Sequence, residues 1–159
     1  TPFNKNTNPD LKYTQIKLPD KNIGYEYADI LKNIFMKNLN IIENCYDRAV
    51  NQEQPGGFTG YGWQDVKNFW STLLSAFPDS NFKIEHISFL NEPNEYAKAA
   101  IRWSLSGNHS GSGNFGEPSN ADVYVMGISH AEFGPSGIKN EWVLFDETSI
   151  WKQILLKTG

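Results

Sequence analysis

The spacing of hydrophobic residues changes once along this chain, near residue 78. Between residues 23 and 46, and again from about Gln64 to Ala76, apolar side chains recur at steps of three and four, the period of one face of a helix. Beyond Pro78 apolar and polar residues alternate, and a period of two is typical of strands. The pattern predicts helices over 23–46, 64–76 and 148–156, and strands over 82–90, 97–106, 122–133 and 138–145.

The segments between these elements are rich in glycine, proline and small polar residues. We expect loops over 50–61 and over the glycine-rich stretch 107–116. Residues 1–20 carry three prolines and several asparagines and aspartates, a composition that predicts a polar arm or linker rather than a packed element. We therefore expect one domain over 21–159 behind this arm.

The order of the elements predicts the fold class. Helices come first and a run of strands follows, which favours an α+β fold with an antiparallel sheet over a doubly wound parallel one. We expect a cone-shaped, strongly curved antiparallel sheet with the N-terminal helices packed on its concave face. Such an arrangement leaves a pocket wherever the helices do not fill the cone.

Charge and composition narrow the classes of function. The chain has 14 basic and 18 acidic residues, without the basic stripe that a general nucleic-acid binder needs. Its apolar runs are too short to span a bilayer, so we expect no membrane partner. The single cysteine, Cys45, excludes an internal disulfide and fits a reducing compartment. We expect a cytoplasmic protein, with a signal peptide removed before Thr1 as the alternative.

Four segments resemble the SnoaL-like polyketide cyclase family. The stretch from Ala100 to Gly111 is similar to the family's RW-x-x-x-G-x-H-x-G segment, and Gly137 to Asp146 resembles its GKI-x-E-x-W-x-x-x-D ending. Phe77-Pro78-Asp79 matches the usual helix-to-strand junction, and Ile150 to Ile154 resembles the closing helix. The resemblance covers roughly residues 25–156. It implies a nuclear transport factor 2-like cone with a deep pocket, and a homodimer formed through the sheets.

The resemblance also implies a reaction, from which this sequence departs. Well-known members close a polyketide ring by intramolecular aldol condensation without metal or cofactor, and an Asp in the last strand is their acid/base. Val143 stands at that position, and Ser129 stands where those cyclases have a histidine. The resemblance therefore carries over the fold and a pocket, with Val143 and Ser129 expected to line it, but not the cyclase chemistry.

Glu141 is the residue that we expect to carry a proton. It lies two positions from Val143 and on the same face of the last predicted strand. Apolar neighbours would disfavour its charged form and raise its pKa toward the range useful for proton transfer. The alternative is a glutamate that faces water at the sheet rim or pairs with a lysine.

Other polar and aromatic residues are candidates for holding a ligand. Arg102, one of two arginines, could bind an anionic group or pair with Glu141, or it could form a structural ion pair. His109 in the glycine-rich stretch could act as acid, base or donor, or it could cap a turn. Tyr61 and Trp63 precede a helix and are candidate ring contacts at a pocket mouth.

His130 shares a strand face with Glu132, and we place it among the substrate-binding candidates. Together with His109, these residues would make the two-histidine, one-carboxylate set of non-haem iron sites. No HExxH motif or cysteine cluster supports a metal, so we expect neither a metal nor a cofactor.

Two functions from different classes fit these observations. The first is a small-molecule pocket protein that takes an apolar or cyclic ligand, acting as a cofactor-independent isomerase, cyclase or hydrolase through Glu141 and His109. The second is a non-catalytic ligand-binding or dimerising module, cut from a longer protein. The absent cyclase Asp and the polar arm favour the second.

Overall fold

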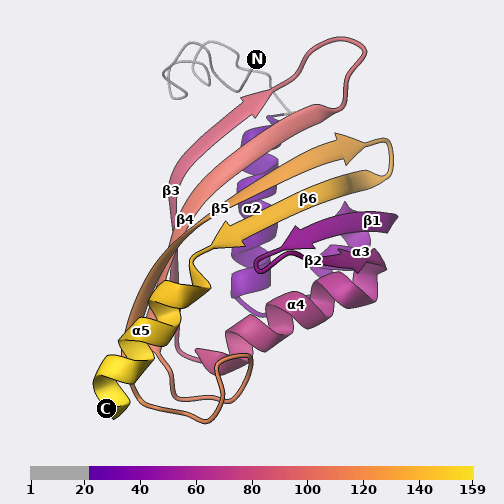
Figure 1. Cartoon of the computed structure of the whole chain (residues 1–159). Helices are drawn as coiled ribbons and strands as arrows, with labels where there is room; N and C mark the ends of the chain where they lie inside the picture. Colours follow the sequence, from indigo (N-terminus) through magenta and orange to yellow (C-terminus); the bar gives the residue numbers. More distant parts are fainter. Residues whose placement is uncertain (1–21) are drawn as a thin grey trace.

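The computed structural model describes residues 22–159, so the arm expected over 1–20 lies outside the described residues (Figure 1). Within this range no helix is both long and apolar enough to cross a membrane. The elements, in chain order, are α2 Ile23–Phe35, α3 Ile41–Cys45, β1 Tyr46–Gln54, β2 Phe58–Tyr61, α4 Gly62–Ala76, β3 Asn81–Leu90, β4 Ala97–Asn108, β5 Asp122–Gly134, β6 Gly137–Phe145 and α5 Glu147–Thr158.

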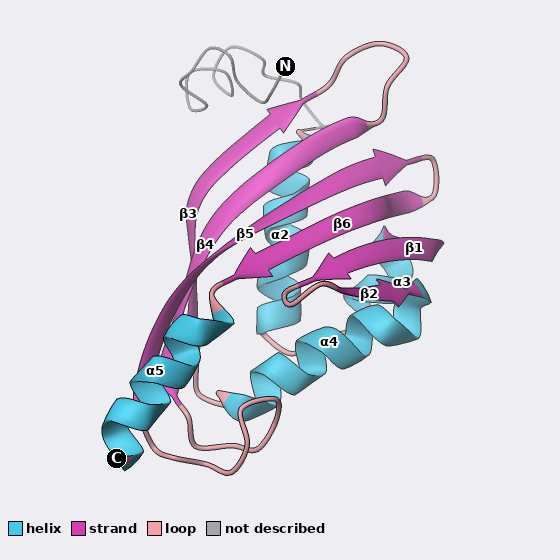
Figure 2. Ribbon diagram, viewed as in Figure 1, coloured by secondary structure: helices cyan, strands magenta, loops and turns pink. Residues whose placement is uncertain are grey.

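The fold is α+β, as expected, with helices packed against one six-stranded sheet (Figure 2). The strand order is β2-β1-β6-β5-β4-β3, and every neighbouring pair is antiparallel except β1 and β6, which run parallel. The prediction of a strongly curved, wholly antiparallel sheet was wrong: the sheet is mixed and is not strongly curled. β1 comes from the N-terminal half of the chain and has two neighbours in the sheet. It pairs antiparallel with its hairpin partner β2 on one side and parallel with the last strand, β6, on the other.

The N-terminal half differs from the expected single helix over 23–46. The Asn22 side chain accepts a hydrogen bond from the Tyr25 amide and caps α2, as expected for an asparagine at a helix start. The helix ends at Phe35, and Lys37 then adopts a left-handed φ of 70° that no continuing helix contains. The expected loop over 50–61 is largely the β1–β2 hairpin.

The two faces of the sheet differ in what they contact. The inner face, which packs on the helices, carries Ile101, Ser129 and Val143 at one level of β4, β5 and β6. The next level along carries Arg102, Ile128 and Leu144 on the outer face. α2 packs on β3 and β4, and α4 packs on β1 and β2.

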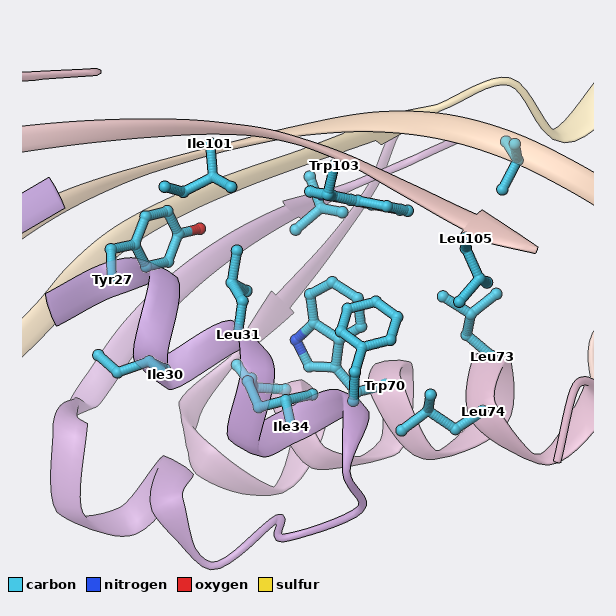
Figure 3. Close-up of a cluster of buried hydrophobic side chains, with 14 of the residues drawn as sticks. Tyr27, Ile30, Leu31, Ile34, Trp70, Leu73, Leu74, Ile101, Trp103 and Leu105 are labelled. Carbon is cyan, nitrogen blue, oxygen red and sulfur yellow. The ribbon is translucent and has the colours of Figure 1, made fainter. Parts of the chain in front are cut away.

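A single hydrophobic core joins α2 and α4 to the inner face (Figure 3). Burying each large apolar side chain stabilises the fold by roughly 1.5–3 kcal/mol. Trp103 of β4 lies at the centre of an aromatic group, with ring centroids 5.6 Å from Phe35 and 5.9 Å from Phe82. The fully buried members include Tyr27, Leu31, Ile34, Trp70, Leu73, Ile101, Trp103 and Leu105.

Candidate functional site

The Glu141 carboxylate is fully buried on the inner face of β6 and accepts three hydrogen bonds. The Tyr27 hydroxyl of α2 donates to Oε2 at 2.6 Å, and the Tyr46 hydroxyl of β1 donates to the same oxygen at 2.8 Å. Gln52 of β1 donates from Nε2 to Oε1 at 2.9 Å. Donors from a helix and a neighbouring strand thus hold one carboxylate inside the core.

Backbone register brings these residues together. Gln52 lies beside Glu141 in the parallel pairing of β1 with β6, and both side chains face inward. On the other side of β6, Ala131 of β5 is opposite Glu141, and Ala99 of β4 follows it. The ring of Tyr27, which approaches from α2, lies edge-to-face with Phe133 of β5, with ring centroids 6.1 Å apart.

Burial dominates the electrostatics of this site. Loss of hydration raises the pKa of Glu141 above its ordinary value, while the three donors oppose that rise by stabilising the anion. Burial and the negative charge of Glu141 also raise the pKa of Tyr27 and of Tyr46 well above 10. Both phenols therefore stay protonated at neutral pH and remain donors to the carboxylate.

Ser129 and Val143 lie next to this carboxylate, directly opposite each other on β5 and β6. The Ser129 hydroxyl accepts a hydrogen bond of 3.0 Å from the Trp103 indole and opposes the rise in the pKa of Tyr27. The structure thus brings together Glu141, Ser129 and Val143, the three residues expected on one pocket-facing surface.

The structure does not bring Arg102 and His130 to this site. Both side chains are exposed on the outer face, while Glu141 is enclosed on the inner face. Successive residues of a strand point to opposite faces, so a one-residue difference in position decides the side. The expected pairing of Arg102 with Glu141 was therefore wrong.

Tyr61 and Trp63 do not share one pocket mouth. Tyr61 is 66% exposed and lines a hollow of about 230 Å³ together with Asn51, Glu141 and Trp142. Trp63 is half-buried, and its indole N–H donates to the Tyr46 carbonyl at 2.8 Å. The Arg48 guanidinium lies 4.8 Å from the Trp63 ring, so this tryptophan supports the strand that carries Tyr46.

His109 is buried far from Glu141. Glu141 is level with Ala99 of β4, and His109 lies ten residues farther along the chain, about 33 Å for an extended strand. The His109 imidazole Nδ1 shares a hydrogen bond of 2.9 Å with the Ser119 hydroxyl and accepts one of 3.3 Å from the Ser119 amide, and the His109 carbonyl accepts from two amides of the same loop. This is the turn-capping alternative, and burial lowers the pKa of the imidazole.

These positions also separate the three residues of the iron-site alternative. His130 is on the outer face, and His109 is inside the loop beyond β4. Among residues 22–159 no three histidine, cysteine or acidic side chains lie close enough to hold a metal ion.

Sequence reasoning missed Tyr27, Tyr46 and Gln52. A buried carboxylate needs donors, so the placement of Glu141 in a core predicts that such residues exist. Tyr27 lies on the apolar face of the expected helix, so the sequence allowed it to be predicted as one of these donors. The other two lie on β1, a strand that the hydrophobic pattern does not reveal, because Gln52 is one of its few inward-facing residues.

Residues 27–154 match the family model described as SnoaL-like polyketide cyclase. The chain belongs to this family. No protein with a curated description matches the sequence. Membership leaves the reaction open, because one fold hosts many functions.

Several solved structures of SnoaL-like proteins share this fold. The SnoaL-like protein of Jannaschia sp. CCS1 superimposes with a TM-score of 0.68 at 13% identity, covering 83% of this chain and 93% of that one. IdmH of Streptomyces antibioticus gives 0.63 at 14% identity, with 80% and 96% covered. AclR of Streptomyces galilaeus, for which a hydroxylase activity has been suggested, gives 0.62 at 13% identity, with 84% and 98% covered. At these identities the similarity shows the fold alone.

Proposed function

We propose that this protein acts on an apolar, cyclic, ketone-bearing small molecule at the inner face of the sheet, with Glu141 as the proton-transfer group and no cofactor. The observation that carries the proposal is the enclosed Glu141 carboxylate with three donors, two of which are phenols. Family membership supports a small-molecule substrate.

The chemistry that fits these groups is proton abstraction next to a carbonyl. Glu141 takes a proton from the carbon beside the ketone, the C–H bond breaks, and its electron pair becomes an enolate. The negative charge then gathers on the ketone oxygen, where a phenol O–H of Tyr27 or Tyr46 would stabilise it. Return of the proton from Glu141 to a different carbon of a conjugated enolate completes an isomerisation. Alternatively, the enolate carbon would form a C–C bond to a second carbonyl and close a ring, and the resulting alkoxide would take the proton from Glu141.

The raised pKa of Glu141 suits this role, because a carboxylate with a higher pKa is a stronger base toward a carbon-bound proton. A substrate must replace one of the three donors to reach the carboxylate. Tyr27 is the donor that belongs to a helix rather than to the sheet, so we propose that the substrate enters between α2 and the sheet. Ser129 and Val143 would then line the substrate, whereas Arg102, His109 and His130 are not part of this proposal.

The test measures proton exchange on a bicyclic ketone, 2-tetralone, in deuterated water by NMR. Wild-type protein should accelerate exchange at the carbons beside the ketone above the buffer rate. Glu141→Gln should reduce that acceleration by about 10²–10⁴-fold, the usual contribution of a general base. Glu117→Gln, which changes an exposed loop carboxylate, is the matched control and should exchange as the wild type does. Equal rates for wild type and Glu141→Gln would refute the catalytic role.

A second candidate function is a dimerising or binding module without catalysis. It is favoured by a row of exposed apolar side chains on the outer face, which an isolated chain would leave in water. This row, called here the outer apolar patch, consists of Tyr124, Met126, Ile128, Trp142 and Leu144. We propose that two copies pair through it, which is compatible with either function.

A further inference from the structure

A groove of about 530 Å³ lies outside the Glu141 site, between the β1–β2 hairpin, α4 and α5. This volume is within the range of small-molecule sites. Two exposed aromatic side chains stand on it, Phe58 of β2 and Trp151 of α5. Trp151 packs edge-to-face against the buried Phe115, with ring centroids 5.5 Å apart, and this contact holds the Trp151 ring in position.

The charged side chains that line this groove are negative. Asp65 of α4 and Glu147 of α5 line it, and neither is in an ion pair within residues 22–159. No lysine, arginine or histidine is among the described residues that line it. Aromatic faces attract cations, and carboxylates bind them, so an anion is disfavoured and a small organic cation fits.

Gln54 connects the groove to the buried carboxylate. Its side-chain nitrogen donates to Gln52 Oε1 at 2.9 Å, and Gln52 Nε2 donates to Glu141 Oε1 at 2.9 Å. An ionised carboxylate only accepts hydrogen bonds, so it fixes the orientation of the Gln52 amide and, through it, that of Gln54. The Gln54 amide oxygen takes part in no hydrogen bond within the described chain, and Gln54 lines the groove.

The orientation of both amides reverses if Glu141 is protonated on Oε1. The Gln52 amide oxygen then accepts a hydrogen bond from the carboxyl O–H of Glu141, and Gln52 Nε2 donates to the Gln54 amide oxygen. Gln54 would thereby present its NH₂ group to the groove instead of its carbonyl. An acceptor facing the groove attracts an ammonium group, whereas a donor repels it.

We propose that this groove binds a small organic amine in its protonated form, and that the Gln54–Gln52 pair couples amine binding to the ionisation of Glu141. Coupling between two sites is reciprocal, so a bound amine also favours the Glu141 anion. The groove proposal does not depend on Glu141 being a catalytic base: loss of 2-tetralone exchange leaves it intact, and loss of amine binding leaves the exchange reaction intact.

The binding test titrates the purified full chain with benzylamine, which is protonated at pH 7, and follows it by ¹H–¹⁵N NMR. Benzyl alcohol is the neutral probe of similar shape. We expect benzylamine to shift the Trp151 indole and Gln54 amide signals and to bind about tenfold more tightly than the alcohol. Trp151→Ala and Glu147→Gln should each weaken amine binding by about tenfold.

Trp142→Ala is the matched control, because Trp142 is a tryptophan of similar exposure, 39% against 42%, on the outer face of the sheet. It should leave the affinity for benzylamine unchanged. Equal affinity for the amine and the alcohol would overturn the cation preference. Unchanged binding in Trp151→Ala, or no shift of the groove signals, would overturn the site itself.

The coupling test compares the pH dependence of benzylamine binding in wild type and Glu141→Gln. The titratable groups that face Glu141 are Tyr27 from α2 and Tyr46 from β1, while the carboxylates of Asp65 and Glu147 line the groove itself. Protonation of the groove carboxylates weakens binding in both proteins. Only wild type should show an additional, separate loss of affinity, which accompanies protonation of Glu141.

Glu141→Gln should also bind benzylamine a few-fold more weakly at pH 7, because its amide favours the reversed orientation of Gln52. Gln54→Met interrupts the amide pair while leaving Glu141 and its three donors in place, so it is the second variant if Glu141→Gln does not fold. It should lose the additional pH-dependent step. A step retained in Gln54→Met, or absent from wild type, would overturn the coupling.

Discussion

The six-membered ring of Trp103 occupies the space into which a side chain at Gly127 would project. The two residues are opposite each other on β4 and β5, and the Trp103 indole reaches onward to Ser129 two positions away. Gly127 therefore lets a fully buried tryptophan lie across β5 beside the Glu141 site. In this position glycine is required for a close approach and not for its backbone freedom.

Gly127→Ala should destabilise the protein by about 1–3 kcal/mol, because the added methyl group forces the Trp103 ring out of its packed position. Urea unfolding at equilibrium measures this change. Combining it with Trp103→Phe, which removes part of the obstructing ring, should cost less than the sum of the single changes. If the stability costs of the two substitutions simply add, the contact between the new methyl group and the Trp103 ring is not the cause of the destabilisation.

Tyr27→Phe should raise the pKa of Glu141 further, since one donor to the anion is removed. The lost hydrogen bond to a charged group should cost about 1.5–3 kcal/mol of stability at neutral pH. The ¹³C shift of the Glu141 carboxyl carbon, followed by NMR as pH changes, reports the titration. Tyr61→Phe, at an exposed position, is the control and should shift neither quantity.

The buried Glu141 should make stability fall as pH rises. Its pKa is higher in the folded protein than in the unfolded chain, so between the two values the folded state binds more protons. The free energy of unfolding contributed by this group is fully present below about pH 4.3 and declines as pH rises through the folded pKa. The difference in unfolding free energy between wild type and Glu141→Gln, measured in urea from pH 4 to 8, should carry this slope. A difference independent of pH would rule out the shift.

His109 should have the opposite effect and make the stability of the protein rise as pH rises. Burial lowers its pKa in the folded protein, so the unfolded chain binds more protons between the folded value and about 6.5. Its contribution is present above pH 6.5 and is lost as pH falls toward the folded pKa. Thermal unfolding of His109→Gln should show less destabilisation between pH 7 and pH 5 than wild type does. An identical loss in both proteins would count against the buried neutral imidazole.

Leu144→Lys should convert the proposed dimer to a monomer, because it places a charge in the centre of the outer apolar patch. Leu144 is opposite Ile128 and is 61% exposed. Light scattering coupled to gel filtration measures the mass, and Leu156→Lys on α5, where the leucine is 85% exposed, is the matched control. A wild-type monomer, or a dimer kept by Leu144→Lys, would reject this interface.

The sequence predicts the second half of the fold well because its strands alternate over long stretches. β5 alternates buried and exposed residues over most of its length, and the turns around it contain glycine. The same regularity predicts that Ser129, Glu141 and Val143 share a face. The family motifs predict the fold but not the face of the sheet on which each side chain lies, so Arg102 was assigned to the wrong face.

The first half is less predictable, since its boundaries depend on single backbone events. The periodic pattern continues past Phe35, and only the left-handed Lys37 ends the helix. β1 packs Tyr46, Val50 and Gln52 inward with solvent-facing polar residues between them, and such a strand lacks a clear hydrophobic period. Both missed donors on the sheet lie in this strand, so the surroundings of Glu141 could not be predicted.

The parallel pairing of β1 with β6 sets the order of events during synthesis. Gln52 and Glu141 are separated by 89 positions in the sequence, and β1 finds its second neighbour only when the last strand exists. Contacts between distant parts of a chain form late and slowly, because the intervening segment must be closed into a loop first. The hydrogen-bonded site around Glu141 therefore cannot assemble on a nascent chain before β6 has been synthesised.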